Sequence, residues 1–233
     1  MPKDNSRARL WTLAHTERAA LADDLATLTD DQWAHQTLCG RWTVEEVVAH
    51  LTAAASTGRF RWIASVLSAR FDFDKHNDRR LAENRGATPA ETLARCGRIL
   101  VLASFRSIIP STTAASGHTA AWLGEVVVQA QDIRQPLGVT TTPSVEAATD
   151  VARFFATTNF TVPSKKSIDG LRLEATDGPF AAGTGPLVTG TTVALVMVMA
   201  GRVSYCDDLG GAGVTTLRDR VAAAAASAKV PRA

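Results

Sequence analysis

The segment Glu125-Val-Val-Val-Gln129-Ala-Gln-Asp132-Ile-Arg134-Gln-Pro136-Leu-Gly138 has the pattern of a helix with polar side chains along one face. A carboxylate at Glu125 and an amide at Gln129 are four residues apart, so they lie one turn apart on the same side of a helix. That spacing suits two ligands of one metal ion. A histidine in place of Gln129 would make the metal signal strong. At about 100° per residue, Asp132 falls within about 60° of the other two.

The surrounding sequence predicts a helix over about residues 118–133, ended by Pro136 and Gly138. Polar groups that face the interior of a helical bundle are costly unless they are paired or bound to a ligand. The polar face is therefore either a hydrogen-bonded or solvated stripe, or a metal or substrate site. Near the end of the helix, Asp132 and Arg134 are expected to form a structural ion pair.

Three further long helices precede this one. Apolar residues at helical spacing predict the first over about residues 5–28. Thr43 and Glu46 form a capping-box pattern that opens the second, which continues toward Leu67. A second capping box with proline at the first helical position, at residues 88–91, opens the third, which runs to about residue 106. Four helices with apolar stripes predict a four-helix bundle.

The pattern changes after Thr140. A short linker leads to a helix over about residues 144–158, followed by a strand at 171–175 and a turn region rich in glycine and proline at 178–190. An apolar helix at 191–200 and an alanine-rich helix ending near Ala228 complete the chain. We therefore expect a mainly α protein, with a bundle domain over residues 1–140 and a small α+β domain over residues 141–233.

The bulk composition excludes several classes of protein. The chain has 233 residues, of which 45% are hydrophobic and 21% charged, as in ordinary soluble proteins. A net charge of +2 is too small to indicate nucleic-acid binding, and no segment approaches the ~20 apolar residues of a membrane span. Three widely separated cysteines, Cys39, Cys96 and Cys206, favour a reduced, cytoplasmic protein in which each is a small buried apolar residue.

His50 lies at the edge of the apolar face of the second helix. Alone, it is either a hydrogen-bonded core histidine or a metal ligand. Metal sites inside bundles are built from side chains on facing helices. His50 together with Glu125 and a further ligand at position 129 would give three ligands and one open coordination position, which is the arrangement of a catalytic site.

Two segments resemble a known family. Leu38-Cys-Gly-Arg-Trp42-Thr-Val-Glu-Glu-Val-Val-Ala-His50-Leu resembles the GWT…AHL signature of the DinB-like bundle superfamily. The segment 125–138 resembles the E-x-x-x-H-x-x-D-I-R-R-P-L-G pattern of its actinobacterial branch, the mycothiol-dependent maleylpyruvate isomerase family. Residues 190–213 resemble that family's C-terminal domain, so the resemblance covers nearly the whole chain.

The resemblance implies roles for particular residues. His50 and Glu125 match the family's metal ligands, and Gln129 stands where the family has its second metal histidine. The family uses a divalent metal, usually zinc, to position a mycothiol-like thiol whose thiolate attacks an unsaturated substrate. Asn77 and Arg80 match the segment at the pocket mouth and are candidates to bind the thiol or an acidic substrate. The alternative is that they belong to a solvated charged loop.

Gln129 leaves several functions open. An amide oxygen is a weaker zinc ligand than imidazole, so the site binds metal weakly, recruits Asp132 for a harder ion, or is empty. The first hypothesis is a metal- and thiol-dependent isomerase or transferase for a small, acidic, unsaturated substrate, with Arg80 orienting the carboxylate. The others are a metal-free small-molecule-binding protein and a metal-free enzyme with Glu125 as general base. In each case we expect a monomer or homodimer without nucleic-acid or membrane partners.

Overall fold

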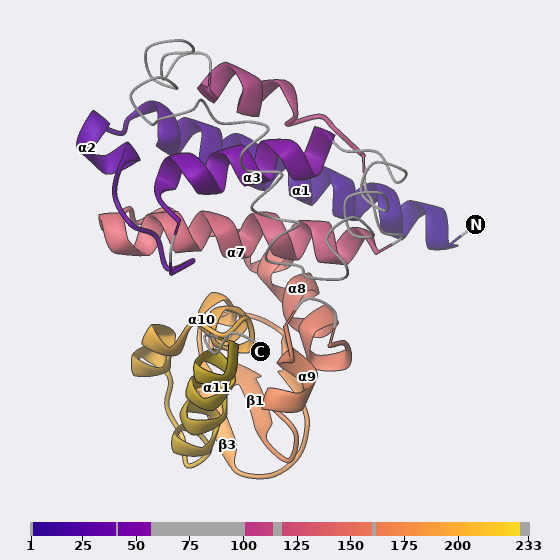
Figure 1. Ribbon diagram of the computed structural model, residues 1–233. Helices are drawn as coiled ribbons and strands as arrows, with labels where there is room; N and C mark the ends of the chain where they lie inside the picture. Colours follow the sequence, from indigo (N-terminus) through magenta and orange to yellow (C-terminus); the bar gives the residue numbers. More distant parts are fainter. Residues whose placement is uncertain (1, 41, 57–100, 114–117, 160–161, 229–233) are drawn as a thin grey trace. The chain divides into compact units, whose positions relative to one another are not determined.

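The computed structural model describes residues 2–40, 42–56, 101–113, 118–159 and 162–228 (Figure 1). The chain divides into two compact units. The helical unit comprises Met1–Trp122 and Gln129–Thr141, and the α/β unit comprises Leu123–Val128 and Thr142–Ala233. Helices dominate, and one small sheet lies in the α/β unit. The predicted fold class, mainly α with a small α+β part after the bundle, is confirmed.

The helical unit contains three long helices and shorter ones. The described elements are α1 (Pro2–Ala26), α2 (Asp30–Trp33), α3 (Val44–Ser56), a helix over residues 101–107, and α7 (Thr119–Leu137). Three of the predicted bundle helices therefore form close to their expected positions. The continuation of the second helix beyond residue 56 and the capping box at 88–91 lie outside the described residues.

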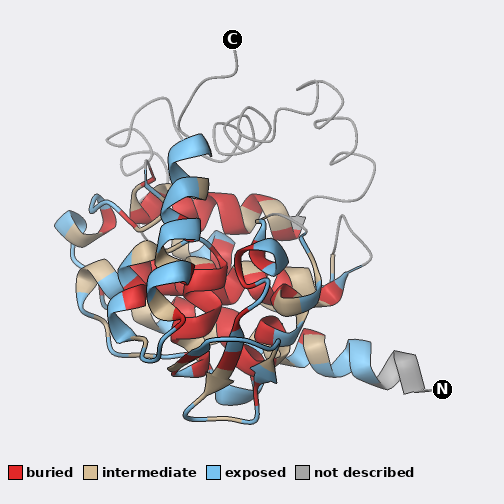
Figure 2. Ribbon diagram, turned by 90° about the horizontal axis from the view of Figure 1, so that it is seen from below, coloured by how far each residue is buried: buried red, intermediate tan, exposed pale blue. Residues whose placement is uncertain are grey.

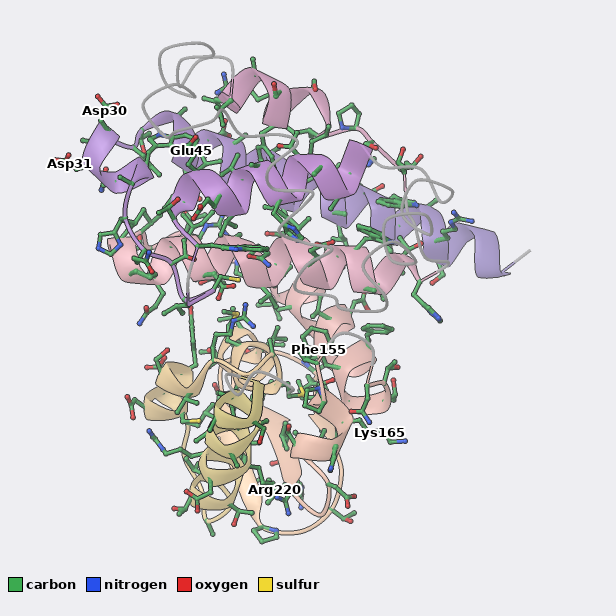
Figure 3. All side chains as sticks on the ribbon, viewed as in Figure 1. Asp30, Asp31, Glu45, Phe155, Lys165 and Arg220 are labelled. Atoms are coloured by element: carbon green, nitrogen blue, oxygen red, sulfur yellow. The ribbon has the colours of Figure 1, made fainter. Side chains whose placement is uncertain are left out.

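Local sequence determines where α3 begins. The carboxylate of Glu46 accepts a hydrogen bond from the backbone N–H of Thr43 at 2.9 Å, and the Thr43 hydroxyl accepts one from the N–H of Glu46 at 3.4 Å. This is the predicted capping box, and it satisfies two backbone donors at the helix start. Acidic side chains also lie in the first turns of α2 and α3, as Asp30, Asp31 and Glu45 show (Figure 3), where the helix dipole favours negative charge.

The segment after residue 107 connects α1 and α3. The guanidinium of Arg18, on α1, donates to the carbonyl oxygens of Ile108 at 3.2 Å and Ser111 at 2.8 Å. The Ser111 hydroxyl donates to the carbonyl oxygen of Ala55 on α3 at 2.9 Å. Because Arg18 is 2% exposed, its charge is solvated by these carbonyl groups in place of water.

The end of α7 differs from the prediction. The helix was expected to stop near residue 133, but it continues through Pro136 to Leu137 and ends at Gly138, whose φ of 66° is left-handed. Proline has no N–H to donate to the carbonyl oxygen of residue 132. The backbone N–H of Leu38 donates to that oxygen at 3.0 Å, so the carbonyl is satisfied and the proline is accommodated.

The predicted ion pair between Asp132 and Arg134 is wrong. Arg134 pairs with Asp24 of α1, with Nη2 and Nε 2.7 and 2.8 Å from Oδ2. The other oxygen of Asp24 accepts from the Thr141 hydroxyl at 2.8 Å. Residues two apart on a helix point in different directions, which explains why Arg134 reaches another helix. The buried pair fastens α1 to the end of α7.

The α/β unit combines helices with a three-stranded sheet. Its elements are α8 (Val145–Thr157), α9 (Ser164–Ser167), β1 (Arg172–Ala175), β2 (Ala181–Ala182), β3 (Leu187–Gly190), α10 (Thr192–Met199), the 3-10 helix η1 (Val203–Asp208) and α11 (Val214–Ala228). The strand order is β2-β1-β3, with β1 and β3 parallel. The region 178–190, predicted as turns, therefore contains two strands.

Glycine explains how two strands fit into that region. At Gly183 (φ 76°) and Gly185 (φ 128°) a Cβ atom would lie 2.1 and 2.2 Å from the carbonyl oxygens of Leu171 and Gly170. Only glycine allows the chain to cross so close to the start of β1. The glycines and prolines of this region correctly predict turns. The pairing of β3 with β1 joins residues distant in the sequence, so composition does not predict it.

Apolar packing holds the α/β unit together. α10 is buried along nearly its whole length and packs against α8. Figure 2 shows buried residues (red) on one side of many helices and exposed residues (pale blue) on the other. The side chain of Phe155 on α8 packs against α7 at Gly124. A Cβ atom added at Gly124 would lie 3.4 Å from the Phe155 ring. Arg220 of α11 donates to the carbonyl oxygens of Ser167 and Asp169 at 3.1 and 2.6 Å (Figure 3).

Candidate active site

The polar face of α7 is half-buried. Glu125 and Gln129 are both of intermediate exposure, whereas Val126, Val128 and Ala130 beside them are buried. The two polar side chains thus lie at the boundary between the packed interior and a more open side of the helix, one turn apart. This is an accessible position for a proton acceptor or a ligand donor. It also agrees with the predicted polar stripe.

His50 lies in the second turn of α3 and is buried, with 9% of its surface exposed. Its ring is 4.9 Å from the ring of Trp42, centroid to centroid, at an interplanar angle of 45°. Trp42 is itself 7% exposed and precedes the Thr43 cap. The tryptophan is therefore a buried anchor at the start of α3, and its ring contacts one side of the imidazole.

A short loop brings a thiol to the polar face of α7. The 36–43 loop, described apart from residue 41, is closed by a bridge between Gln36 and Thr43. The N–H and hydroxyl of Thr37 donate to the carbonyl oxygen of Trp42 at 2.9 and 2.8 Å. The N–H of Cys39 donates to the Thr37 hydroxyl at 3.2 Å. These bonds hold residues 36–39 against Trp42 and Thr43.

Cys39 contacts the residue on which the metal hypothesis depends. Its Sγ donates to Oε1 of Gln129 at 3.4 Å, and the cysteine is half-buried. The prediction that Cys39 is a buried apolar residue is therefore wrong. No sequence signal places position 39 beside position 129, because the contact spans 90 residues of chain.

Cys206 behaves as predicted, and Cys96 lies outside the described residues. Cys206 is 1% exposed, and burial raises the pKa of its thiol, with a smaller opposing effect from Arg218. A buried thiol of raised pKa is a poor nucleophile at neutral pH. Of the two described cysteines, Cys39 is therefore the more accessible.

The donor set near α7 fits zinc poorly. Within the described ranges, no group of three or more His, Cys, Asp or Glu side chains is arranged to hold a metal ion. The predicted ligands His50, Glu125 and Gln129 include only two residues of those types, and the amide oxygen of Gln129 already accepts from Cys39. Asn77 and Arg80, predicted to bind the thiol or substrate, lie outside the described residues.

The helical bundle and the small sheet together define the class of protein by its fold. The chain has the DinB-like fold of the maleylpyruvate isomerases, since it aligns with two solved structures at a TM-score of 0.53. These are mycothiol-dependent maleylpyruvate isomerase and a variant in which one histidine is replaced by alanine. Each is 14% identical to this chain, and each alignment covers 88% of this chain and 92% of the other. At this identity the likeness establishes the fold.

The family follows from the domain matches. Residues 14–146 match the mycothiol maleylpyruvate isomerase N-terminal domain, and residues 142–220 match the MDMPI C-terminal domain. The chain therefore belongs to the mycothiol-dependent maleylpyruvate isomerase family, as the resemblance predicted. Membership is consistent with the predicted thiol-dependent isomerase activity. No curated protein matches the chain, and none of the helices in the described ranges is long and apolar enough to cross a membrane.

Proposed function

We propose that this protein is a low-molecular-weight-thiol-dependent isomerase or transferase that acts on a small, acidic, unsaturated substrate in the cytoplasm. The observation that carries the proposal is the pair of family matches, which together extend over residues 14–220 in the family's order. We further propose that residues 1–140 form the catalytic domain and residues 141–233 the C-terminal domain. The half-buried polar face of α7 supports an active site in the first of these.

In the proposed reaction the thiol supplies the nucleophile, and the chain supplies a proton acceptor and the groups that bind substrate and thiol. When bound, the thiol supplies a nucleophile that adds to an activated double bond and leaves again, so no oxidant is needed. Glu125 is half-buried, so its carboxylate can take a proton at the edge of the packed interior. Arg80 orients a substrate carboxylate, and Asn77 with Arg80 holds the thiol. Arginine suits this role because its guanidinium matches a carboxylate in a bidentate fashion.

Metal binding is proposed to be weak. His50, Glu125 and Gln129 are the proposed ligands, and an amide oxygen is a poorer zinc donor than imidazole. No catalytic step of the proposed reaction requires the metal. Elemental analysis of untagged protein purified without chelator measures the site directly, and we expect clearly less than one zinc per chain. A full equivalent of tightly held zinc would contradict this part of the proposal.

The direct test of activity uses mycothiol and maleylpyruvate, the thiol and substrate in the family's name. Loss of the cis substrate is followed by absorbance with and without thiol, and we expect turnover only with thiol. Glu125→Gln should lower kcat by about 10²–10⁴-fold if the carboxylate transfers a proton. Gln135→Ala, an exposed change on the same helix, should leave the rate unchanged.

A second function is favoured by one observation. The amide oxygen of Gln129 accepts a hydrogen bond from Cys39, an interaction that competes with a metal ion for that oxygen. A metal-free protein on this fold would bind a small molecule at the same face, or use Glu125 as a general base. Thiol-independent turnover, or a rise in melting temperature with small dicarboxylates but no turnover, would favour this alternative.

A further inference from the structure

We propose that Pro136 is a positioning residue for the candidate active site. By withholding an N–H from the carbonyl oxygen of Asp132, it leaves that oxygen to the N–H of Leu38, which fixes the 36–43 loop on α7 with Cys39 against Gln129. The inference rests on the proposed function only for its effect on turnover. The positioning itself is a property of the described residues.

The acceptor is available because of the proline. In a regular helix the carbonyl oxygen of residue 132 would accept from the N–H of residue 136. Pro136 has no N–H, and its ring pushes that carbonyl away from the helix axis. Asp132 is 0% exposed, so water cannot readily satisfy the carbonyl. The Leu38 N–H does so at 3.0 Å.

The loop transmits this anchoring to the candidate site residues. One residue beyond Leu38, the Cys39 thiol reaches Gln129, one turn before Asp132 on α7. At the other end of the loop, the carbonyl oxygen of Trp42 accepts two hydrogen bonds from Thr37, and the Trp42 ring lies on His50. The attachment at Leu38 therefore fixes the part of the loop that carries Cys39 beside Gln129.

The first measurement is amide hydrogen exchange at Leu38 in the full chain. Pro136→Ala restores an N–H that competes for the Asp132 carbonyl, so exchange at Leu38 should accelerate by about fivefold to tenfold, the effect of losing one hydrogen bond. Gln135→Ala, in the same turn and exposed, is the matched control and should leave it unchanged. Unchanged exchange at Leu38 in Pro136→Ala would overturn the proposal.

The second measurement reports the position of the thiol. Site-resolved alkylation with iodoacetamide compares Cys39 with the buried Cys206 in the same protein. In Pro136→Ala the Cys39 rate should rise by about threefold or more, because the thiol leaves its amide acceptor, while the Cys206 rate stays constant. Equal acceleration at both cysteines would also overturn the proposal, since it would indicate general loosening of the fold.

Activity separates this inference from the proposed function. If the protein is a thiol-dependent isomerase, we expect the thiol to bind beside the Cys39–Gln129 contact as well as at Asn77 and Arg80. Pro136→Ala should then raise KM for the thiol by about threefold or more and leave kcat at saturating thiol within about twofold. An unchanged thiol KM in an active enzyme would refute the positioning role. A wild-type protein without thiol-dependent turnover, in which Leu38 and Cys39 still respond, would refute the proposed function and leave the loop attachment established.

Discussion

The helical unit and the α/β unit bury different kinds of side chain. Among the described residues, the interior of the helical unit includes ionisable groups and amides: Glu17, Arg18, Glu45, His50, Gln131, Asp132 and Arg134. In the α/β unit the buried polar residues are small hydroxyl side chains: Thr149, Ser164, Ser167 and Thr192. Around these, α10 contributes a helix that is almost entirely apolar.

The contrast bears on where the proposed activity resides. Burying an ionisable group is costly unless it is paired or hydrogen-bonded, so an interior that contains several of them is adapted to more than stability. A stable fold could use apolar residues instead, as the α/β unit does. The difference supports the proposal that residues 1–140, which include α7, carry the chemistry and that residues 141–233 are mainly structural.

The largest expected effect comes from breaking the buried pair of the helical unit. Arg134→Leu leaves Asp24 without its cation and should lower the free energy of unfolding by about 3–5 kcal/mol. The Arg134–Asp24 and Arg218–Asp207 pairs have the same 2.7 Å separation, but Arg134 is 1% exposed and Arg218 is 38% exposed. Urea denaturation of Arg134→Leu and Arg218→Leu compares them directly. Similar losses in both variants would remove the distinction between the units.

The apolar interior of the α/β unit should be nearly as sensitive. Leu195 on α10 is 0% exposed, so Leu195→Ala should cost about 2–5 kcal/mol through lost burial and a residual cavity. Circular dichroism during urea denaturation measures the loss. If the α/β unit is mainly structural, thiol-dependent kcat under native conditions should change little. A large fall in kcat with native structure retained would show that the α/β unit takes part in catalysis.

An intermediate effect is expected at the position that departs from the family pattern. Gln129→His supplies an imidazole in place of an amide and should raise zinc affinity by about 10–100-fold. Titration with a chromophoric zinc chelator measures the change, and Cys39→Ala in the same background tests competition from the thiol. Unchanged zinc affinity in Gln129→His would show that His50 and Glu125 do not form a metal site with position 129.

The smallest effect concerns pH. Burial raises the pKa of the Cys206 thiol. Above the pH at which an exposed thiol ionises, the unfolded chain releases this proton while the folded chain keeps it, so stability falls as pH rises. Cys206→Ala should remove that part of the alkaline decline. The free energy of unfolding of the wild type and of Cys206→Ala is measured at about pH 7 and pH 9.5. If it falls equally in both proteins, the Cys206 thiol contributes nothing to the pH dependence.

Local signals in the sequence predicted the helices well. The Thr43–Glu46 capping box and the apolar spacing of α1 depend on residues within a few turns of one another, so they can be recognised without the fold. The extension of α7 through Pro136 could not be foreseen, because it depends on a donor from Leu38. The pairing of β3 with β1 also joins residues that are distant in the sequence, so local patterns could not predict it.

The candidate site likewise combines features that local sequence predicts with features that only tertiary contacts determine. The face that carries Glu125 and Gln129 follows from helical spacing, and His50 was proposed from its place on a facing helix and then matched through the resemblance. The contact between Cys39 and Gln129 joins residues 90 positions apart. It depends on how the 36–43 loop is fixed to α7, which is a tertiary property. The partner of Arg134 is likewise set by the packing of α1 beside the end of α7.

Ser111 has a consequence for the order in which the chain folds. Its carbonyl oxygen accepts from His15 and Arg18, and its hydroxyl donates to Ala55, so its bonds close loops of 96, 93 and 56 residues. Closing such long loops costs chain entropy, which disfavours forming these bonds early in folding. We expect them to form after the rate-limiting step. A change at Ser111 should then speed unfolding more than it slows refolding.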